Sequence, residues 1–235
     1  MNILRNIRYL FHSLLQSATG KKMEPAKRTI AAILLCILCG IAVTYWPVNN
    51  APPAHLADDP DSPAIGNPYG RPVIVVVFSD YHCGPCKELS TDLEAFTRED
   101  THLRVIFKEY PVLGENSVLA AKSALAVHFA NERKYFAYHQ ALMQSSERFT
   151  EAELEASAVG LGIASEAYRK ALQDPRIEEQ IHRNYQLSNQ LYFSAVPTVV
   201  VGGKVLVGNS IERIRAAVAQ TRSDEEKTVT APAAR

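Results

Sequence analysis

The chain has 235 residues, of which 47% are hydrophobic and 21% are charged, and this composition excludes an intrinsically disordered protein. Its length fits one ordinary domain with additional segments, or two small domains. The 25 Lys and Arg residues balance 25 Asp and Glu residues, so the overall charge gives no support to a nucleic-acid-binding function.

The N-terminal part combines a basic segment with an uncharged apolar run. Residues 1–28 hold six basic side chains against the single acid Glu24, whereas residues 29–46 hold no charge. As a helix this run would reach about 27 Å, close to the roughly 30 Å hydrocarbon core of a bilayer. Because basic residues mark the cytoplasmic side, we predict a cytoplasmic segment, then a signal-anchor in the inner membrane, with the rest of the chain in the periplasm or its equivalent. A cleaved signal peptide is the alternative.

Residues 47–70 follow this run and are rich in proline, with almost no large apolar side chains. We predict an extended linker that holds the next domain off the bilayer.

From residue 71 the pattern becomes that of a folded domain. The β-branched run V-I-V-V-V-F over residues 73–78 predicts a buried strand, residues 83–97 predict a helix, and residues 103–110 predict a second strand. Such a β-α-β unit has parallel strands and a right-handed crossover.

The second half of the domain begins with a helical block over about residues 115–191, which we resolve into about four helices. Thr150 and Glu153 form a capping box within it. Two antiparallel strands follow with a turn at Gly202-Gly203, and Asn209 and Glu212 open a last helix through about Gln220. We therefore predict an α/β domain over residues 71–220 with the order β-α-β, helical insertion, β-β-α, and a disordered tail over residues 221–235.

Two cysteines, Cys83 and Cys86, stand where the first strand gives way to a helix. Unpaired backbone N–H groups and the helix dipole stabilise a thiolate at such a position, so we expect a lowered pKa for Cys83. Gly84 and Pro85 lie between the thiols, and Pro85 suits a first turn that needs no donor. Cys86 lies one turn on, near enough to close a disulfide. We expect Cys83 to be the exposed attacking sulfur and Cys86 the buried resolving sulfur.

Two other roles for this pair are weaker. A structural zinc site needs about four ligands, and the exported part of the chain offers only these two cysteines and no histidines at ligand spacing, so we predict no metal and no cofactor. A purely structural disulfide would close too short a loop to stabilise the fold much. Cys36 and Cys39 share the same spacing inside the apolar run, where a thiolate is disfavoured, and we interpret them as apolar filler.

A second signal is the tripeptide Val196-Pro197-Thr198 at the start of a predicted strand. A proline there cannot donate to the sheet. A cis bond before Pro197 would leave backbone groups of Val196 free to pair with an extended peptide, and a trans proline on an edge strand is the alternative.

These motifs together resemble the DsbA family of thiol:disulfide oxidoreductases, especially its membrane-tethered bacterial members. The resemblance rests on G-N-P-Y-G-R-P-V-I-V-V-V-F-S-D-Y-H-C-G-P-C, K-E-Y-P-V-L-G and A-V-P-T-V-V-V-G-G, and covers about residues 65–219. It implies a thioredoxin fold with an inserted helical domain, a redox-active Cys83–Cys86 pair and a cis Pro197 beside it. It also implies that electrons pass from folding substrate proteins to a membrane quinone reductase of the DsbB type.

The chain departs from this family in two places. Val77 stands where many relatives carry an acid, so a buried-carboxylate proton relay is not implied at that position. The Gly84–Pro85 dipeptide is that of thioredoxin, which implies a less stabilised thiolate than in strong oxidants, although His82 could compensate by its charge. We interpret Glu109, at a strand end, as structural and Lys87 as a solvated helix charge.

The sequence thus predicts a monomeric, exported, membrane-anchored oxidoreductase that introduces disulfides into reduced substrate proteins. Cys83 and Cys86 would carry the chemistry, with substrate held along Val196 and Thr198. One alternative keeps the pair but reverses the flow, giving a reductase or isomerase fed by a transmembrane electron donor. Another is a peptide-binding chaperone module in which the thiols have no role.

Overall fold

The computed structural model describes residues 56–145 and 148–230. The predicted cytoplasmic segment 1–28 and signal-anchor 29–46 lie outside these residues. Within the part of the chain that is described, no helix combines the length and apolar character needed to cross a bilayer.

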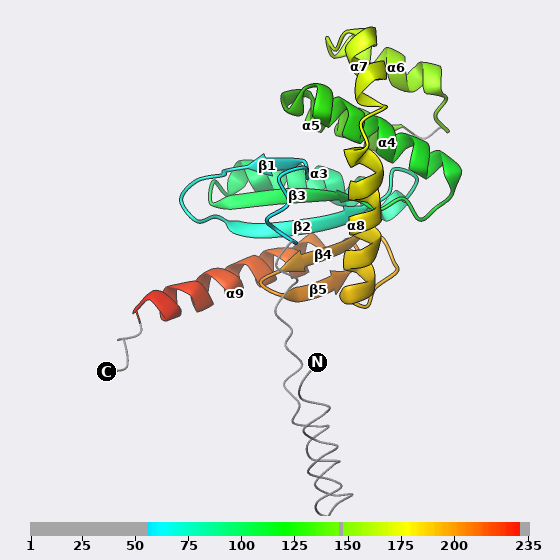
Figure 1. The fold of residues 1–235 in the computed structure, drawn as a ribbon. Helices are drawn as coiled ribbons and strands as arrows, with labels where there is room; N and C mark the ends of the chain where they lie inside the picture. The colour runs from blue at the N-terminus through cyan, green and yellow to red at the C-terminus, as the bar shows by residue number, and fades with distance from the viewer. Residues whose placement is uncertain (1–55, 146–147, 231–235) are drawn as a thin grey trace, which may run out of the picture. The chain divides into compact units, whose positions relative to one another are not determined.

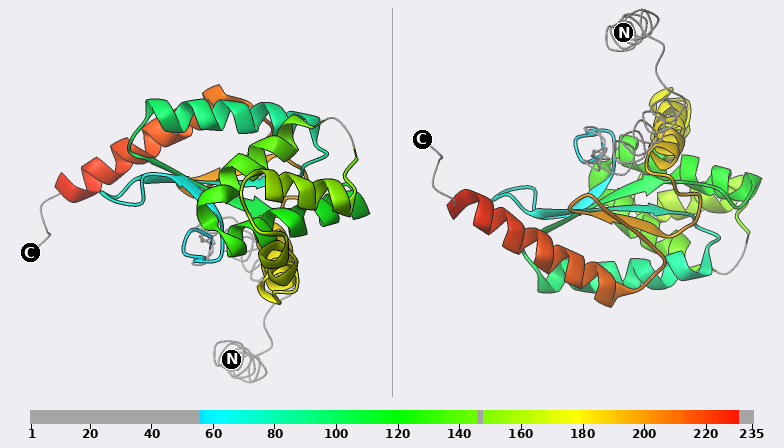
Figure 2. Two further views of the ribbon diagram at one scale, coloured as in Figure 1. Left: turned by 90° about the horizontal axis from the view of Figure 1, so that it is seen from above. Right: turned by 90° about the horizontal axis from the view of Figure 1, so that it is seen from below.

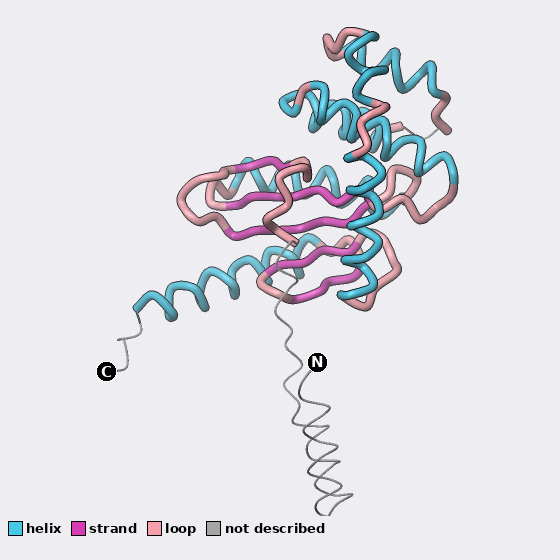
Figure 3. The backbone as a smooth tube through the Cα atoms, viewed as in Figure 1, coloured by secondary structure: helices cyan, strands magenta, loops and turns pink. Residues whose placement is uncertain are grey.

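Five strands form one mixed sheet in the order β1-β3-β2-β4-β5 (Figures 1 and 3). The central pair, β2 and β3, is parallel, and the other three pairs are antiparallel. The strands are β1 (Ala64–Gly66), β2 (Val73–Ser79), β3 (Leu103–Glu109), β4 (Thr198–Val201) and β5 (Lys204–Val207). The predicted β-α-β unit and the thioredoxin-type arrangement are confirmed.

Helices cover both faces of the sheet and build a separate layer at one end. α3 and α9 lie on one face and α8 on the other, while α4 to α7 stand together beyond the end of the sheet (Figures 1 and 2). The helices are α3 (Gly84–Glu99), α4 (Glu115–Ala130), α5 (Glu132–Gln144), α6 (Glu151–Gly160), α7 (Ser165–Ala171), α8 (Arg176–Gln190) and α9 (Ile211–Thr230). In its described residues the insertion therefore comprises five helices, where about four were expected.

The central strand β2 is buried on both faces, which explains its unbroken apolar run. Val75 and Val77 pack into the core beneath α3 and α9, whereas Val76 and Phe78 pack into a second core with residues of α8 and the segment after it. Both cores are closed by apolar side chains, so the sheet holds its strand ends, and the loops on them, in fixed positions.

The predicted linker is wrong in its described part, because residues 56–66 belong to the folded domain. Leu56 is buried in the second core, and β1 pairs with β3, with Ala64 opposite Ile106. The sequence pattern hides this segment because its buried contacts are polar. Asp59 and Ser62 meet Lys108, whose side chain is completely buried.

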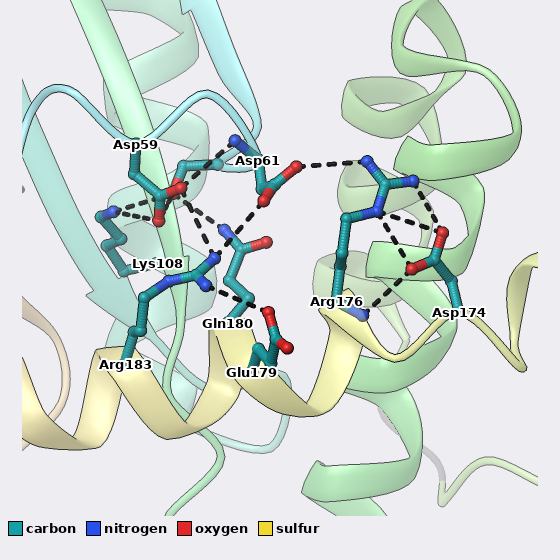
Figure 4. A network of polar contacts seen from close by, with 9 residues as sticks. Asp59, Asp61, Lys108, Asp174, Arg176, Glu179, Gln180 and Arg183 are labelled. Carbon is teal, nitrogen blue, oxygen red and sulfur yellow. Dashed lines mark hydrogen bonds and ion pairs between the residues drawn. The ribbon is translucent and has the colours of Figure 1, made fainter.

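A polar network joins this segment to β3 and α8 (Figure 4). Lys108 Nζ lies 3.2 Å from Asp59 Oδ2 and 2.8 Å from Ser62 Oγ. Arg183 adds longer ion pairs to Asp59 and Asp61, at 3.6 and 3.5 Å. Burial disfavours the charged form of Asp59, but the charge and hydrogen bond of Lys108 and the charge of Arg183 outweigh it and lower the pKa of Asp59.

The C-terminal part confirms the hairpin and corrects the last helix. Gly202 and Gly203 both have positive φ, as the tight turn between β4 and β5 requires. α9 continues to Thr230, so residues 221–230 are helical rather than disordered, and residues 231–235 lie outside the description. Its start is capped by Ser210, whose Oγ accepts the Arg213 N–H, and not by Asn209. The capping box of Thr150 and Glu153 is present.

Candidate active site

Cys83 is the N-cap of α3 and lies just past the end of β2. Its backbone is extended, with φ −87° and ψ 112°, and its Sγ accepts the Cys86 N–H at 3.2 Å. Pro85 occupies the first turn, where its missing N–H leaves no bond unmade. This N–H also donates to the Cys83 carbonyl at 3.1 Å, so the strand-to-helix junction shares a first-turn N–H between that oxygen and the first sulfur of the pair.

Both thiols are free, and their pKa values are shifted in opposite directions. Hydrogen bonding from the Cys86 side chain is the main cause that lowers the pKa of Cys83, assisted by the Cys86 N–H and the charge of Lys87. Burial and the charge of Asp80 act in the other direction. The hydrogen bond to Cys83, with burial second, raises the pKa of Cys86 far above its ordinary value. Cys83 is therefore the sulfur prepared to carry negative charge.

The expected contrast in exposure is smaller than predicted. Cys83 is 5% exposed and Cys86 is 2% exposed, so both sulfurs are buried. The difference between them lies in hydrogen bonding rather than in solvent access.

The Val196–Pro197 bond is cis, the first of the two alternatives for this position. Cys83 Sγ lies 3.5 Å from the Val196 carbonyl oxygen, so the start of β4 and the start of α3 meet. Thr198 is completely buried, and its hydroxyl donates to the Ala195 carbonyl at 2.7 Å. The side chain of Thr198 therefore lies within the sheet at the start of β4.

His82, next to the cysteine, is held by Asn116 from the start of α4. Asn116 Nδ2 donates to the Phe149 carbonyl while its Oδ1 accepts the Phe149 N–H, which fixes the orientation of the amide. His82 Nε2 lies 2.7 Å from the same Oδ1 and must therefore donate to it. The nearby cation that lowers the pKa of Cys83 is Lys87, which we had expected to be solvated and which donates to the Ser145 carbonyl.

Sequence reasoning missed Asp80, a fully buried carboxylate between β2 and the cysteines. Its Oδ1 accepts the His82 N–H at 2.8 Å and the Ser117 hydroxyl at 2.7 Å, and its Oδ2 accepts the backbone N–H groups of Val112 and Leu113. Its charge raises the pKa of both thiols. The available signal was an acid placed directly after a buried strand and just before the cysteine motif.

A second buried carboxyl, Glu109, lies at the end of β3, where its partner on β2 is Ser79. Its Oε1 accepts hydrogen bonds from Tyr81 and Tyr135, each at 2.7 Å. Burial raises the pKa of Glu109 to about 7, against the opposing effect of these two hydroxyls. The sequence analysis gives neither tyrosine, nor His139 beside them, a role in the site.

The interior next to Cys86 contains a cavity of about 10 Å³. It is lined by Val77, Ser90, His139 and Pro197 among others. Val77 gives this cavity an apolar wall at the position where the family resemblance would allow an acid. Among the described residues, no cluster of His, Cys, Asp and Glu side chains could hold a metal ion.

Comparisons with known proteins agree with this arrangement. The thioredoxin family profile matches residues 58–220. The chain is 31% identical to a thioredoxin-like oxidoreductase of Silicibacter pomeroyi DSS-3, covering 72% of this chain and 96% of that one, with a TM-score of 0.66. It is 30% identical to the thiol-disulfide exchange protein alpha-DsbA2 of Wolbachia pipientis, covering 71% and 90%, also with a TM-score of 0.66.

Curated proteins match at lower identity. A Na⁺/H⁺ antiporter NhaA 1 of Salinispora arenicola is 24% identical over 198 residues, which cover 84% of this chain but only 28% of the antiporter. A probable disulfide bond formation protein D of Bacillus anthracis is 23% identical over 146 residues, covering 57% of this chain and 67% of that protein.

Proposed function

Because this chain belongs to the thioredoxin family, and to its DsbA-like thiol:disulfide oxidoreductases, we propose that Cys83 and Cys86 exchange disulfides with cysteines of other proteins. One observation carries this proposal: the Cys83 sulfur accepts a helix N–H beside the Val196 carbonyl. A thiolate stabilised in this way is both a good nucleophile and a good leaving group.

We propose that the pair acts as an oxidant of substrate proteins. A substrate thiolate attacks Cys83 Sγ of the Cys83–Cys86 disulfide, forming a mixed disulfide and releasing Cys86. A second substrate thiolate then attacks the substrate sulfur, which forms the substrate disulfide and releases Cys83 as a thiolate. Two electrons pass from the substrate dithiol to the enzyme, and the lowered pKa of Cys83 favours this direction.

A reductase or isomerase is the second candidate, and a specific observation favours it. The buried charge of Asp80 raises the pKa of both thiols, which weakens the preference for the reduced form. The thioredoxin-like Gly84–Pro85 dipeptide also weakens the preference for the reduced form, because it implies a less stabilised Cys83 thiolate.

The proposed cellular location of this reaction rests on the sequence before residue 56. We propose that residues 29–46 anchor a monomeric chain in the inner membrane and that the catalytic domain faces the periplasm or its equivalent. The recycling partner would then be a membrane protein, either a quinone reductase of the DsbB type or, for the second candidate, a transmembrane electron donor. No cofactor takes part, because the thiols carry both electrons.

Trapping tests the proposal in the native membrane. Cys86→Ala leaves Cys83 able to form mixed disulfides but unable to resolve them, so we expect covalent adducts that a reducing agent releases. Cys83→Ala is the matched control and should give none. Equal adducts with both variants, or no adducts with Cys86→Ala, would contradict the proposal. The adducts' identities would name the substrates and the recycling partner.

A further inference from the structure

A continuous line of polar side chains runs through the interior from Glu109 toward Cys86. Glu109 Oε1 lies 2.7 Å from the Tyr81 hydroxyl, and that hydroxyl lies 2.9 Å from His139 Nδ1. On the other side of the ring, His139 Nε2 lies 3.1 Å from Ser90 Oγ. All four residues are at most 5% exposed, so this line is sealed from bulk water.

Every link in this line can either donate or accept a hydrogen bond. With the proton on Glu109, the carboxyl donates to Tyr81, Tyr81 donates to His139 Nδ1, and His139 Nε2–H donates to Ser90. With Glu109 ionised, all three bonds reverse and His139 carries its proton on Nδ1. The same distances satisfy both arrangements, and they differ by one proton moved along the line.

The line ends next to Cys86. Ser90 lies one helical turn after Cys86 on α3, and both residues line the cavity of about 10 Å³ together with His139. Most of the lining is apolar, but Ser79, Ser90 and His139 supply polar groups. The cavity is near the smallest that holds one water, and a water bound to these groups would complete the path from Ser90 Oγ to Cys86 Sγ. No acid on β2 offers a shorter path, because the β2 residues that line this cavity are Val77 and Ser79.

Disulfide exchange requires that Cys86 gain a proton when it is released and lose one when it attacks. Building on the proposed function, we propose that Glu109 holds this proton and exchanges it with Cys86 through Tyr81, His139 and Ser90. Above about pH 7, Glu109 would be protonated in the disulfide form and ionised in the dithiol form.

The step balances in either direction of electron flow. When a substrate thiolate breaks the Cys83–Cys86 bond, the electron pair goes to Cys86 Sγ and the proton of Glu109 follows, leaving a Cys86 thiol and a Glu109 carboxylate. When the Cys86 thiol attacks a mixed disulfide on Cys83, its proton returns to Glu109 and the leaving thiolate departs with the electron pair. One proton thus moves between two buried groups, and none has to reach solvent from Glu109.

The electrostatics around Glu109 support this role. Burial raises its pKa to about 7, and the nearby charge of Asp80 adds to the effect, while Tyr135 and Tyr81 oppose it. Apart from the hydrogen bond to Cys83, burial raises the pKa of Cys86 above that of an ordinary thiol, so transfer from Glu109 to a released Cys86 thiolate is downhill. Burial lowers the pKa of His139 to about 3, so the ring passes the proton between neutral forms. Glu109 Oε2 has no hydrogen-bond partner among the described residues, which favours the neutral acid.

Release kinetics test the relay. Cys83 is loaded with 5-thio-2-nitrobenzoate, and the attack of Cys86 is followed by the coloured thiolate that it releases. We expect Glu109→Gln and Tyr81→Phe to slow this release by about 10²-fold, the usual contribution of a positioned acid or base. Wild-type release should rise with pH and level off above about 7, whereas in the variants it should keep rising. Tyr138→Phe is the matched control, because it removes a buried α5 hydroxyl that binds Ser123 and the Leu154 carbonyl instead.

Infrared spectroscopy tests the relay without any variant. In wild-type protein with ¹³C-labelled glutamate at a pH above about 7, the disulfide form should show a shifted carboxylic-acid band that disappears on reduction. Absence of that band, or unchanged release rates and pH profiles in both variants, would overturn the relay while leaving the trapping result in place. Failure of wild-type Cys83 to form any mixed disulfide would instead overturn the proposed function, and the relay with it.

Discussion

Individual charged groups around Cys83 act in opposite directions on its acidity. The Cys86 hydrogen bond and Lys87 favour the thiolate, whereas Asp80 disfavours it. Asp80 is also bound by four donors, two of them in the loop before α4, one within α4 and one just before the cysteines, so its carboxylate is held beside the thiols. The reduction potential is therefore a balance between a helix end and a buried carboxylate, and neither alone decides it.

The raised pKa of Glu109 makes the stability of the fold depend on pH. The folded protein holds a proton on Glu109 up to about pH 7, whereas the ordinary pKa is 4.5. Because the folded state then binds more protons than the unfolded state, the free energy of unfolding falls as pH rises from about 4.5 through 7. The loss should be about 3 kcal/mol for a shift of this size.

Urea unfolding of the wild type and Glu109→Gln at several pH values checks this. The difference in unfolding free energy between them should change in favour of the variant as pH rises, and level off above about 7. Glu132→Gln, which removes an exposed acid at the start of α5, is the control and should show no such change. A constant difference between wild type and Glu109→Gln from pH 4 to 8 would contradict the prediction.

At the scale of elements, the buried Lys108–Asp59 pair fastens residues 56–66 to β3. Asp59→Asn would leave the Lys108 charge buried without its partner, and we expect a loss of about 3–5 kcal/mol in unfolding free energy. The double variant with Lys108→Met removes the charge as well and should recover much of that loss. A double-mutant cycle by urea denaturation measures the coupling.

An exposed ion pair provides the control for that cycle. Glu94 and Arg98 form a pair along α3, where solvent screens the charges, so removal of Glu94 should change stability by less than about 1 kcal/mol. Additive losses at Asp59 and Lys108 would show that the segment is held by its apolar contacts alone.

The sequence predicts those elements whose cores are apolar. The apolar run of β2, the apolar residues of β3 and the two-glycine turn all have hydrophobic or conformational signals, and the structure has all three. β1 escapes prediction because its segment is held by Asp59, Ser62 and Lys108, and no hydropathy pattern reports a buried ion pair. The end of α9 escapes for a related reason: its last turns are mostly exposed.

At the scale of the whole molecule, oxidation of the thiol pair should change global stability. If the protein is an oxidant, its reduced form is the more stable one, because the folded state favours the Cys83 thiolate. The difference in unfolding free energy should be about 1.4 kcal/mol for each 30 mV by which folding raises the potential.

Urea midpoints of the reduced and oxidised forms measure this. A higher midpoint for the reduced form supports the oxidant, and a higher midpoint for the oxidised form would favour the reductase or isomerase. Cys83→Ser combined with Cys86→Ser is the control, because its midpoint should not respond to redox conditions.

The candidate site divides in the same way between predictable and hidden parts. Cys83, Cys86 and the cis Pro197 follow from local motifs and a family resemblance. Tyr81, His139 and Glu109 do not, because they come from three distant segments that only the folded chain brings together. The sequence analysis interprets Glu109 as structural, because an acid at a strand end is usually exposed to solvent. In the folded protein its side chain is only 1% exposed.

The contact between Cys83 and the Val196 carbonyl spans 113 residues of chain, and this spacing bears on how a new molecule matures. During synthesis the thiol pair leaves the ribosome long before β4 exists. Until then the pair lacks the strand that completes its surroundings, and long-range pairing of β4 with β2 forms slowly. A nascent chain therefore carries its thiol pair past other thiols without the strand that completes the site, and the full site exists only when its last third has folded.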